Sequence, residues 1–256
     1  MDAMKKLLKI TFENAKLKGI WHYSLPSGHS CPGAKNCYTK ADKVTGKITD
    51  LQTPVDGVTY RCYAAVDEAR RPNVRALRWH NFDLIKAAKT VQEKTELICA
   101  SIPEALRRVG GILRVHVGGD YFSYDYLRAW LAASAKFPRV RFYSYTKSIQ
   151  FLAKYLETNK LPDNFVFTCS RGGKYDNLIP STNVKSAKVF FSQEEIDALG
   201  LNVDHTDELA IFGEDNFALL IHGSQPAKSD ASKALSANKK KGFSGYKTRQ
   251  KSKTVI

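Results

Sequence analysis

From residue 110 onward, short apolar runs of strand type alternate with longer helical stretches. The strand candidates are Ile112 to Val117, Val140 to Tyr145, Phe165 to Cys169, Ala187 to Phe191 and Phe217 to His222. Helical patterns cover residues 124 to 137 and 149 to 157, and another helix begins near Ser192. Strands that alternate with helices predict right-handed βαβ units and a parallel sheet.

A sixth strand candidate, Trp21 to Leu25, precedes this region, and residues 65 to 109 form a long helical stretch with breaks expected at Pro72 and Pro103. Six strands fit a partial or irregular TIM-like (β/α) barrel better than a complete eightfold one. The 256 residues suffice for one large domain. We therefore expect a single α/β barrel-like domain over residues 1 to 223.

Three of the five cysteines, Cys31, Cys37 and Cys62, lie in a Gly- and Pro-rich excursion over residues 26 to 63. Five residues separate the first pair and twenty-four the second. In a reducing compartment, neighbouring cysteines are more often metal ligands or catalysts than disulfides. Three thiolates suit an iron–sulfur centre, whereas zinc would want a fourth ligand, for which His29 is the nearest candidate.

The segment Gly118-Gly119-Asp120 follows the strand candidate that ends at Val117. Parallel sheets place their chemistry at the carboxyl ends of strands, and glycines let the backbone approach a ligand closely. We expect Gly118, Gly119 and Asp120 to form a cofactor or substrate shelf, with Asp120 free for chemistry. Period-two alternation predicts that His116 shares a face with Arg114, as a second catalytic candidate.

Two further strand ends carry aromatic and cationic groups. Tyr145 and Lys147 are candidates for cofactor binding, and Arg114, Lys147, Arg171 and Lys174 for contacts to phosphates. Cys99 and Cys169 lie in apolar contexts typical of packing residues.

The net charge of +15 favours a polyphosphate partner, and nucleic acid is the leading class. Residues 224 to 256 read as a basic flexible tail that contacts phosphates. Its cationic candidates include Lys239, Lys240, Lys241, Lys247 and Arg249. No apolar run is long enough for a membrane span and no secretory signal is recognisable, so we expect no membrane association and a cytoplasmic location. The oligomeric state is not indicated.

Several of these motifs together resemble the phage gene product 88 family. The resemblance rests on Ser-Leu-Pro-Ser-Gly-His-Ser-Cys-Pro-Gly-Ala at 24 to 34, the Cys-Tyr pairs at 37 and 62, Arg-Val-His-Val-Gly-Gly-Asp-Tyr-Phe at 114 to 122, and Tyr-Ser-Tyr-Thr-Lys at 143 to 147. It covers most of residues 10 to 225. It implies a phage or phage-derived protein that works in an infected or lysogenic host cell.

A more remote resemblance is to radical S-adenosylmethionine enzymes, in which a cysteine trio holds a [4Fe–4S] cluster and a Gly-Gly-acid strand end meets the methionine moiety. The sequence departs from that pattern, because the short Cys-x3-Cys-x2-Cys spacing is absent and Asp120 replaces the commoner glutamate.

The sequence thus favours a metal-dependent enzyme that modifies nucleic acid, with an iron–sulfur cluster and S-adenosylmethionine as its cofactors. One alternative is a zinc-containing base-exchange enzyme resembling the transglycosylases, with Asp120 as nucleophile. The other is a non-catalytic nucleic-acid-binding protein with a structural metal.

Overall fold

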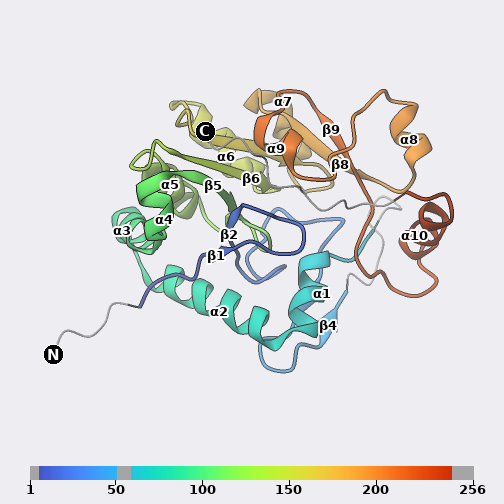
Figure 1. Ribbon diagram of the computed structural model, residues 1–256, viewed down its shortest axis with the longest axis horizontal. Helices are drawn as coiled ribbons and strands as arrows, with labels where there is room; N and C mark the ends of the chain where they lie inside the picture. Colours follow the sequence, from blue (N-terminus) through green and yellow to red (C-terminus); the bar gives the residue numbers. More distant parts are fainter. Residues whose placement is uncertain (1–5, 51–58, 244–256) are drawn as a thin grey trace.

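A seven-stranded sheet forms the centre of the molecule (Figure 1). The computed structural model describes residues 6–50 and 59–243. The strand order is β1-β2-β5-β6-β7-β8-β9; β1 runs antiparallel to β2 and every other neighbouring pair is parallel. The strands are β1 (Thr11–Phe12), β2 (Trp21–Tyr23), β5 (Gly111–Val115), β6 (Val140–Thr146), β7 (Phe165–Ser170), β8 (Ser186–Phe190) and β9 (Phe217–Leu220).

All six predicted strands are confirmed as β2 and β5 to β9, and the α/β class with parallel strands is confirmed with them. The short antiparallel strand β1 was not predicted. Across the described residues no pairing joins β9 to β1, so the sheet is open and a closed barrel is not formed. Because β2 and β5 to β9 all run parallel to one another, their carboxyl ends lie along one edge of the sheet.

The predicted breaks in the long helical stretch are confirmed, because α2 begins at Pro72 and α4 begins directly after Pro103. A third break before Val91 arises where Thr90 and Glu93 form a capping box. The helices are α1 (Tyr63–Arg70), α2 (Pro72–Ala87), α3 (Val91–Ser101), α4 (Glu104–Val109), α5 (Tyr124–Ser134), α6 (Ile149–Leu156), α7 (Ile179–Thr182), α8 (Gln193–Asp197), α9 (Glu208–Phe212) and α10 (Asp230–Lys240), with a 3₁₀ turn η1 (Asp176–Leu178).

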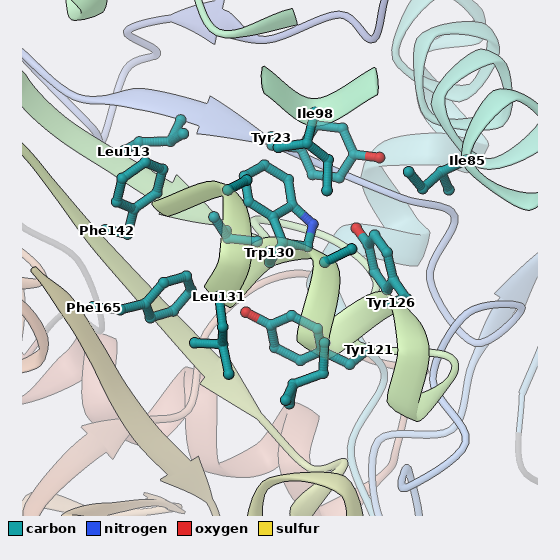
Figure 2. Packing of buried hydrophobic residues seen from close by; sticks show 14 of the residues in the cluster. Tyr23, Ile85, Ile98, Leu113, Tyr121, Tyr126, Trp130, Leu131, Phe142 and Phe165 are labelled. Atoms are coloured by element: carbon teal, nitrogen blue, oxygen red, sulfur yellow. The ribbon is translucent and has the colours of Figure 1, made fainter. Parts of the chain in front are cut away.

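The larger part of the core lies between the sheet and helices α3, α5 and α6. Trp130 of α5 is fully buried at its centre, with Tyr23 and Tyr126 beside it (Figure 2). The Trp130 and Tyr23 ring centroids are 5.1 Å apart. Alternate strand residues such as Leu113 and Phe142 point to this side. We call it the helix face of the sheet.

The opposite side of the sheet, the inner face, carries a smaller cluster that includes Tyr143 and Phe217. Helix α9 contacts β6 and β7 there and contributes Ile211. An N-terminal segment around Leu17 also packs against this face. Near the carboxyl ends of the strands the same face borders a cavity, which Tyr145 and Leu219 help to line.

The predicted flexible tail over residues 224 to 256 is wrong in part. Residues 230 to 240 form α10, which Ser229 caps, and Asn238 donates a hydrogen bond of 2.8 Å to the carbonyl of Phe191. Buried Ala231 and Asn238 supply contacts that the lysine-rich sequence concealed. Lys247 and Arg249 lie outside the described residues. Among those that are described, no helix has the length and apolar character that a membrane crossing demands.

Candidate functional site

A single pocket of about 170 Å³ lies where the strands end, and it gathers most of the predicted site residues. Its described lining comprises Lys16, Cys31, Ala34, Cys37, Tyr60, Arg61, Cys62, Tyr63, Ala64, Arg114, His116, Val117, Gly118, Gly119, Asp120, Tyr145, Thr146, Lys147, Ser170, Val189, Asp207, Leu219, Ile221 and His222. We call it the thiol pocket, because Cys31, Cys37 and Cys62 all line it whereas Cys99 and Cys169 do not.

Hydrogen bonds attach the first part of the segment that carries the cysteines to the strand ends and to helix α1. The Leu25 N–H donates to the carbonyl of Gly118 at 2.8 Å, and the Ser27 N–H donates to the buried carboxylate of Glu68 at 2.9 Å. Farther along, the Asn36 N–H donates to the carbonyl of Gly172 at 3.1 Å. These bonds set the backbone of the cysteine segment across the carboxyl ends of β5 and β7.

Two glycines allow this close approach. A Cβ atom on Gly33 would lie 2.0 Å from the carbonyl oxygen of Lys147, and one on Gly119 would lie 2.6 Å from Ser30 Oγ. Gly119 also has a φ of +84°, which side chains disfavour. Gly33 and Gly119 thus let the chain's own cysteine segment pack against the strand ends.

Asp120 is a heavily hydrogen-bonded carboxylate, only 5% exposed. Its Oδ1 accepts from the Tyr121 N–H and from the Thr146 hydroxyl, both at 2.7 Å, and its Oδ2 accepts from the Lys147 N–H at 2.8 Å. Burial raises the pKa of this carboxyl, and the three donors oppose the rise. The carboxylate was expected to be free for chemistry; the structure gives it partners that join the ends of β5 and β6.

Burial raises the pKa of the Cys31 thiol well above its ordinary value and that of Cys37 to about 11. For Cys37 the charge of Lys147 opposes burial, while the neighbouring Cys62 and Asp120 add to it. All three thiols are free. Over the described part of the chain, no three His, Cys, Asp or Glu side chains are already arranged to hold a metal ion.

Of the two candidate histidines, His116 lines the thiol pocket and His29 does not. The prediction that the His116 side chain shares a face with Arg114 is wrong: its ring packs against Tyr121 on the helix face and bonds the Tyr126 hydroxyl at 2.8 Å. Strand β5 ends at Val115, so its alternation does not extend to residue 116. His29 is absent from the pocket lining; its Nε2 bonds the carbonyl of Ala41 at 3.0 Å, and its ring meets Trp79.

The inner wall of the pocket holds an ion-pair cluster that the sequence did not reveal. Asp207, 1% exposed, accepts from Arg114 Nη1, from the Tyr143 hydroxyl at 2.8 Å and from Lys16 Nζ at 3.1 Å. Burial alone would raise the pKa of Asp207, but Arg114 and Lys16 outweigh it and bring it to about 2. The cluster positions Arg114, which lies 5.0 Å from the ring centre of Tyr145.

Tyr145 lines the pocket, and its buried hydroxyl has no hydrogen-bond partner among the described residues. His222 lines the wall nearby, with its ring 5.1 Å from that of Tyr63. It lies two residues after the end of β9, so the preference of site residues for strand ends could have identified it. Asp207 and Lys16 lie in irregular segments, where no pattern marked them.

The cationic candidates divide into two groups. Arg114 and Lys147 are 6% and 7% exposed, so they cannot contact phosphates on an open surface. The Lys147 ammonium donates to the carbonyl and hydroxyl of Ser170 and to the carbonyl of Arg171. Arg171 and Lys174 lie outside the thiol pocket and line a neighbouring groove.

A family model described as Gene product 88 matches residues 2–242. The chain belongs to the gene product 88 family. It is 33% identical over 104 residues to the Gene 88 protein of Mycobacterium phage L5 and 32% identical over 104 residues to that of Mycobacterium phage D29. Each match covers 39% of this chain and 43% of the relative, less than half of either.

No solved structure matches the chain. The comparisons bear out the phage gene product 88 resemblance and give no support to the radical S-adenosylmethionine one.

We predict that Asp207→Asn lowers the free energy of unfolding by about 3–5 kcal/mol at pH 7, because it leaves buried Arg114 without its counter-charge. The folded-state pKa of about 2 lies below the ordinary 3.8, so the carboxylate's contribution is present above pH 4 and is lost as pH falls toward 2. Denaturant unfolding between pH 3 and 7 should show that the difference in free energy of unfolding between wild type and variant becomes smaller at acid pH. Exposed Asp215→Asn is the control. If the difference in free energy of unfolding between wild type and Asp207→Asn did not vary with pH, the ion-paired carboxylate with a lowered pKa would be contradicted.

We also predict that Asp120→Asn lowers the free energy of unfolding by about 1–3 kcal/mol, because an amide nitrogen replaces one acceptor and leaves a buried donor unsatisfied. Denaturant unfolding measures the change, with exposed Asp163→Asn as control. Stability equal to wild type would show that the carboxylate does not hold the strand ends and is available for chemistry.

Proposed function

We propose that this protein is a metal-dependent enzyme that modifies nucleic acid, with its reaction centre in the thiol pocket. The observation that supports the proposal best is the sorting of the cysteines. The three in the segment from 26 to 63 line one pocket at the carboxyl ends of parallel strands, and the other two do not. Parallel α/β folds place their chemistry at this edge.

The donor set suits a thiophilic metal, because three thiols face a pocket into which His29 does not reach. The thiols would have to draw together on loading, since no metal-holding group is already assembled among the described residues. Raised pKa values at Cys31 and Cys37 mean that loading releases protons. An iron–sulfur cluster with S-adenosylmethionine remains our first choice of cofactors, and zinc is the alternative.

A bound metal would supply redox or Lewis-acid chemistry, and the surrounding side chains would bind and orient the substrate. The Tyr145 hydroxyl offers an unused hydrogen-bonding group at the wall. Arg114 supplies positive charge next to it, held in place by Asp207. Free thiols and a phage origin of the family fit the cytoplasm of an infected or lysogenic host cell.

Nucleic acid is proposed as the substrate because of the net charge of +15 and its distribution. Lys239, Lys240 and Lys241 are exposed at the end of α10, and the residues after 243 add four more cations. A polyanion is the simplest partner for such a surface.

We predict that Cys31→Ser, Cys37→Ser and Cys62→Ser each lose most of the metal that anaerobically purified protein carries. Each removes one thiolate from a shared centre, whereas the matched control Cys99→Ser lies outside the pocket and should keep the metal. Elemental analysis measures the metal content, and absorption spectra identify the centre. An iron–sulfur protein would be brown and a zinc protein colourless. Full metal content in all three pocket variants would refute the metal centre.

We further predict that truncation after Phe243 flattens the dependence of nucleic-acid affinity on salt. It removes Lys247, Arg249, Lys251 and Lys253 and leaves α10 in place. At about 0.7 per phosphate contact on a single strand, the slope of log affinity against log salt should fall by up to about 3. Binding titrations at several salt concentrations measure the slope, and a slope equal to that of the full chain would exclude these residues from binding.

A further inference from the structure

A second cavity of about 490 Å³ lies beside the thiol pocket, and Tyr60 and Val189 line both. Its described lining comprises Lys35, Asn36, Tyr60, Arg171, Gly172, Gly173, Lys174, Asp176, Asn177, Lys188 and Val189. We call it the basic groove. The cysteine segment forms one side of it and the residues after β7 form the other, joined by the bond from the Lys174 N–H to the carbonyl of Gly33 at 2.9 Å.

The charge of this groove is strongly one-sided. Lys35, Arg171, Lys174 and Lys188 stand against one carboxylate among the lining residues that the structure describes. That carboxylate, Asp176, accepts from the backbone N–H groups of Gly172 and Gly173 at 2.8 and 2.9 Å. Its acceptors are therefore already engaged with the backbone.

The cations keep hydrogen-bonding capacity for a ligand. Lys174 Nζ donates to the carbonyl of Pro32 at 3.1 Å, and Arg171 Nε donates to Ser186 Oγ at 3.0 Å. Each of these contacts uses one donor, and an ammonium has three while a guanidinium has five. Groups of this kind bind phosphate oxygens well, the guanidinium in a bidentate manner.

The position of the groove next to a buried pocket limits the form of the substrate. The three cysteines line the thiol pocket at the carboxyl edge of the sheet together with Tyr60, and a base stacked within a duplex could not enter this pocket. Enzymes with such pockets act on single strands or extrude the base. Aromatic rings commonly stack on unpaired bases, and Tyr60 lies between the two cavities.

We propose that the basic groove binds the phosphate backbone of an unpaired strand and directs one base past Tyr60 into the thiol pocket. This inference deepens the proposed function and rests on it for the fate of the base. The binding step itself requires neither metal nor reaction, so it can be tested independently.

The test measures fluorescence anisotropy of a labelled 20-nucleotide oligothymidylate with the full chain across a salt series. Arg171→Gln combined with Lys188→Gln removes two groove cations, and Lys136→Gln combined with Lys160→Gln removes two exposed cations outside both cavities. We expect the groove pair to weaken binding at least tenfold and to lower the salt slope by about 1.4, at about 0.7 per contact. The matched pair should stay within about threefold of wild type.

Tyr60→Leu tests stacking separately from charge. It should weaken oligothymidylate binding about tenfold while Tyr60→Phe binds like wild type. Circular dichroism and metal content of each variant show whether the fold and the thiol pocket are intact, and a variant that fails to fold is replaced by Arg171→Lys or Tyr60→Trp. The Arg171→Lys variant should weaken binding less than the Gln pair, and Tyr60→Trp should retain it.

Equal losses for the groove pair and the matched pair would overturn the proposal, because net charge alone would then explain binding. Displacement of the oligonucleotide by polyglutamate at equal charge concentration would overturn it in favour of an acidic peptide. Protein that binds oligothymidylate through the groove yet carries no metal would support this inference and defeat the metal-dependent function. If the protein carries metal but the groove variants bind oligothymidylate like wild type, the groove inference fails while the proposed metal centre stands.

Discussion

The hydrogen bonds of one buried carboxylate hold together the edge of the sheet on which the site depends. Asp120, after β5, accepts from Thr146 and Lys147 at the end of β6, and the Lys147 ammonium in turn bonds Ser170 at the end of β7. A buried carboxylate is costly unless hydrogen bonds offset its desolvation, and here three donors do so. The carbonyl of Lys147 is also the surface against which Gly33 packs. Asp120 and Lys147, which are hydrogen-bonded to each other, thus connect three strand ends and the cysteine segment.

The second electrostatic device lies on the inner face. Asp207, at the start of α9, forms ion pairs with Arg114 and Lys16. The pair with Arg114 ties the start of α9 to β5. Two cations around one carboxylate leave positive potential at the pocket wall, although Asp204 nearby moderates it. A buried ion pair barely offsets its own desolvation, so the cluster adds little net stability, whereas loss of one partner would be costly. Its location beside Tyr145 suits the orientation of a polar ligand group.

The strands could be predicted from sequence because each apolar run is bounded by turn residues, and the helix breaks because proline cannot continue a helix. The convergence of Cys31 with Gly118-Gly119-Asp120 followed from the rule that parallel strands end at one edge. Side-chain directions beyond a strand end were not predictable, and His116 shows why: alternation holds only while the backbone stays extended. The Arg114–Asp207 pair spans ninety-three residues, a separation at which no local pattern acts. Helix α10 was missed because its few buried contacts, Ala231 and Asn238, carry no apolar period.

The Gly-Gly-Asp motif illustrates how a structural role and a chemical one can share the same residues. Gly119 is required by the close approach of Ser30, and Asp120 by the donors of the next strand, so packing accounts for both. Yet the same packing places Cys31 beside that strand end, where its thiol accepts from the Gly28 N–H at 3.3 Å. The motif therefore helps to position the cysteine segment, and its three residues also line the thiol pocket. Chemistry in this pocket would then depend on the thiols and on Arg114 and Tyr145, with Asp120 as the residue that positions the segment around them.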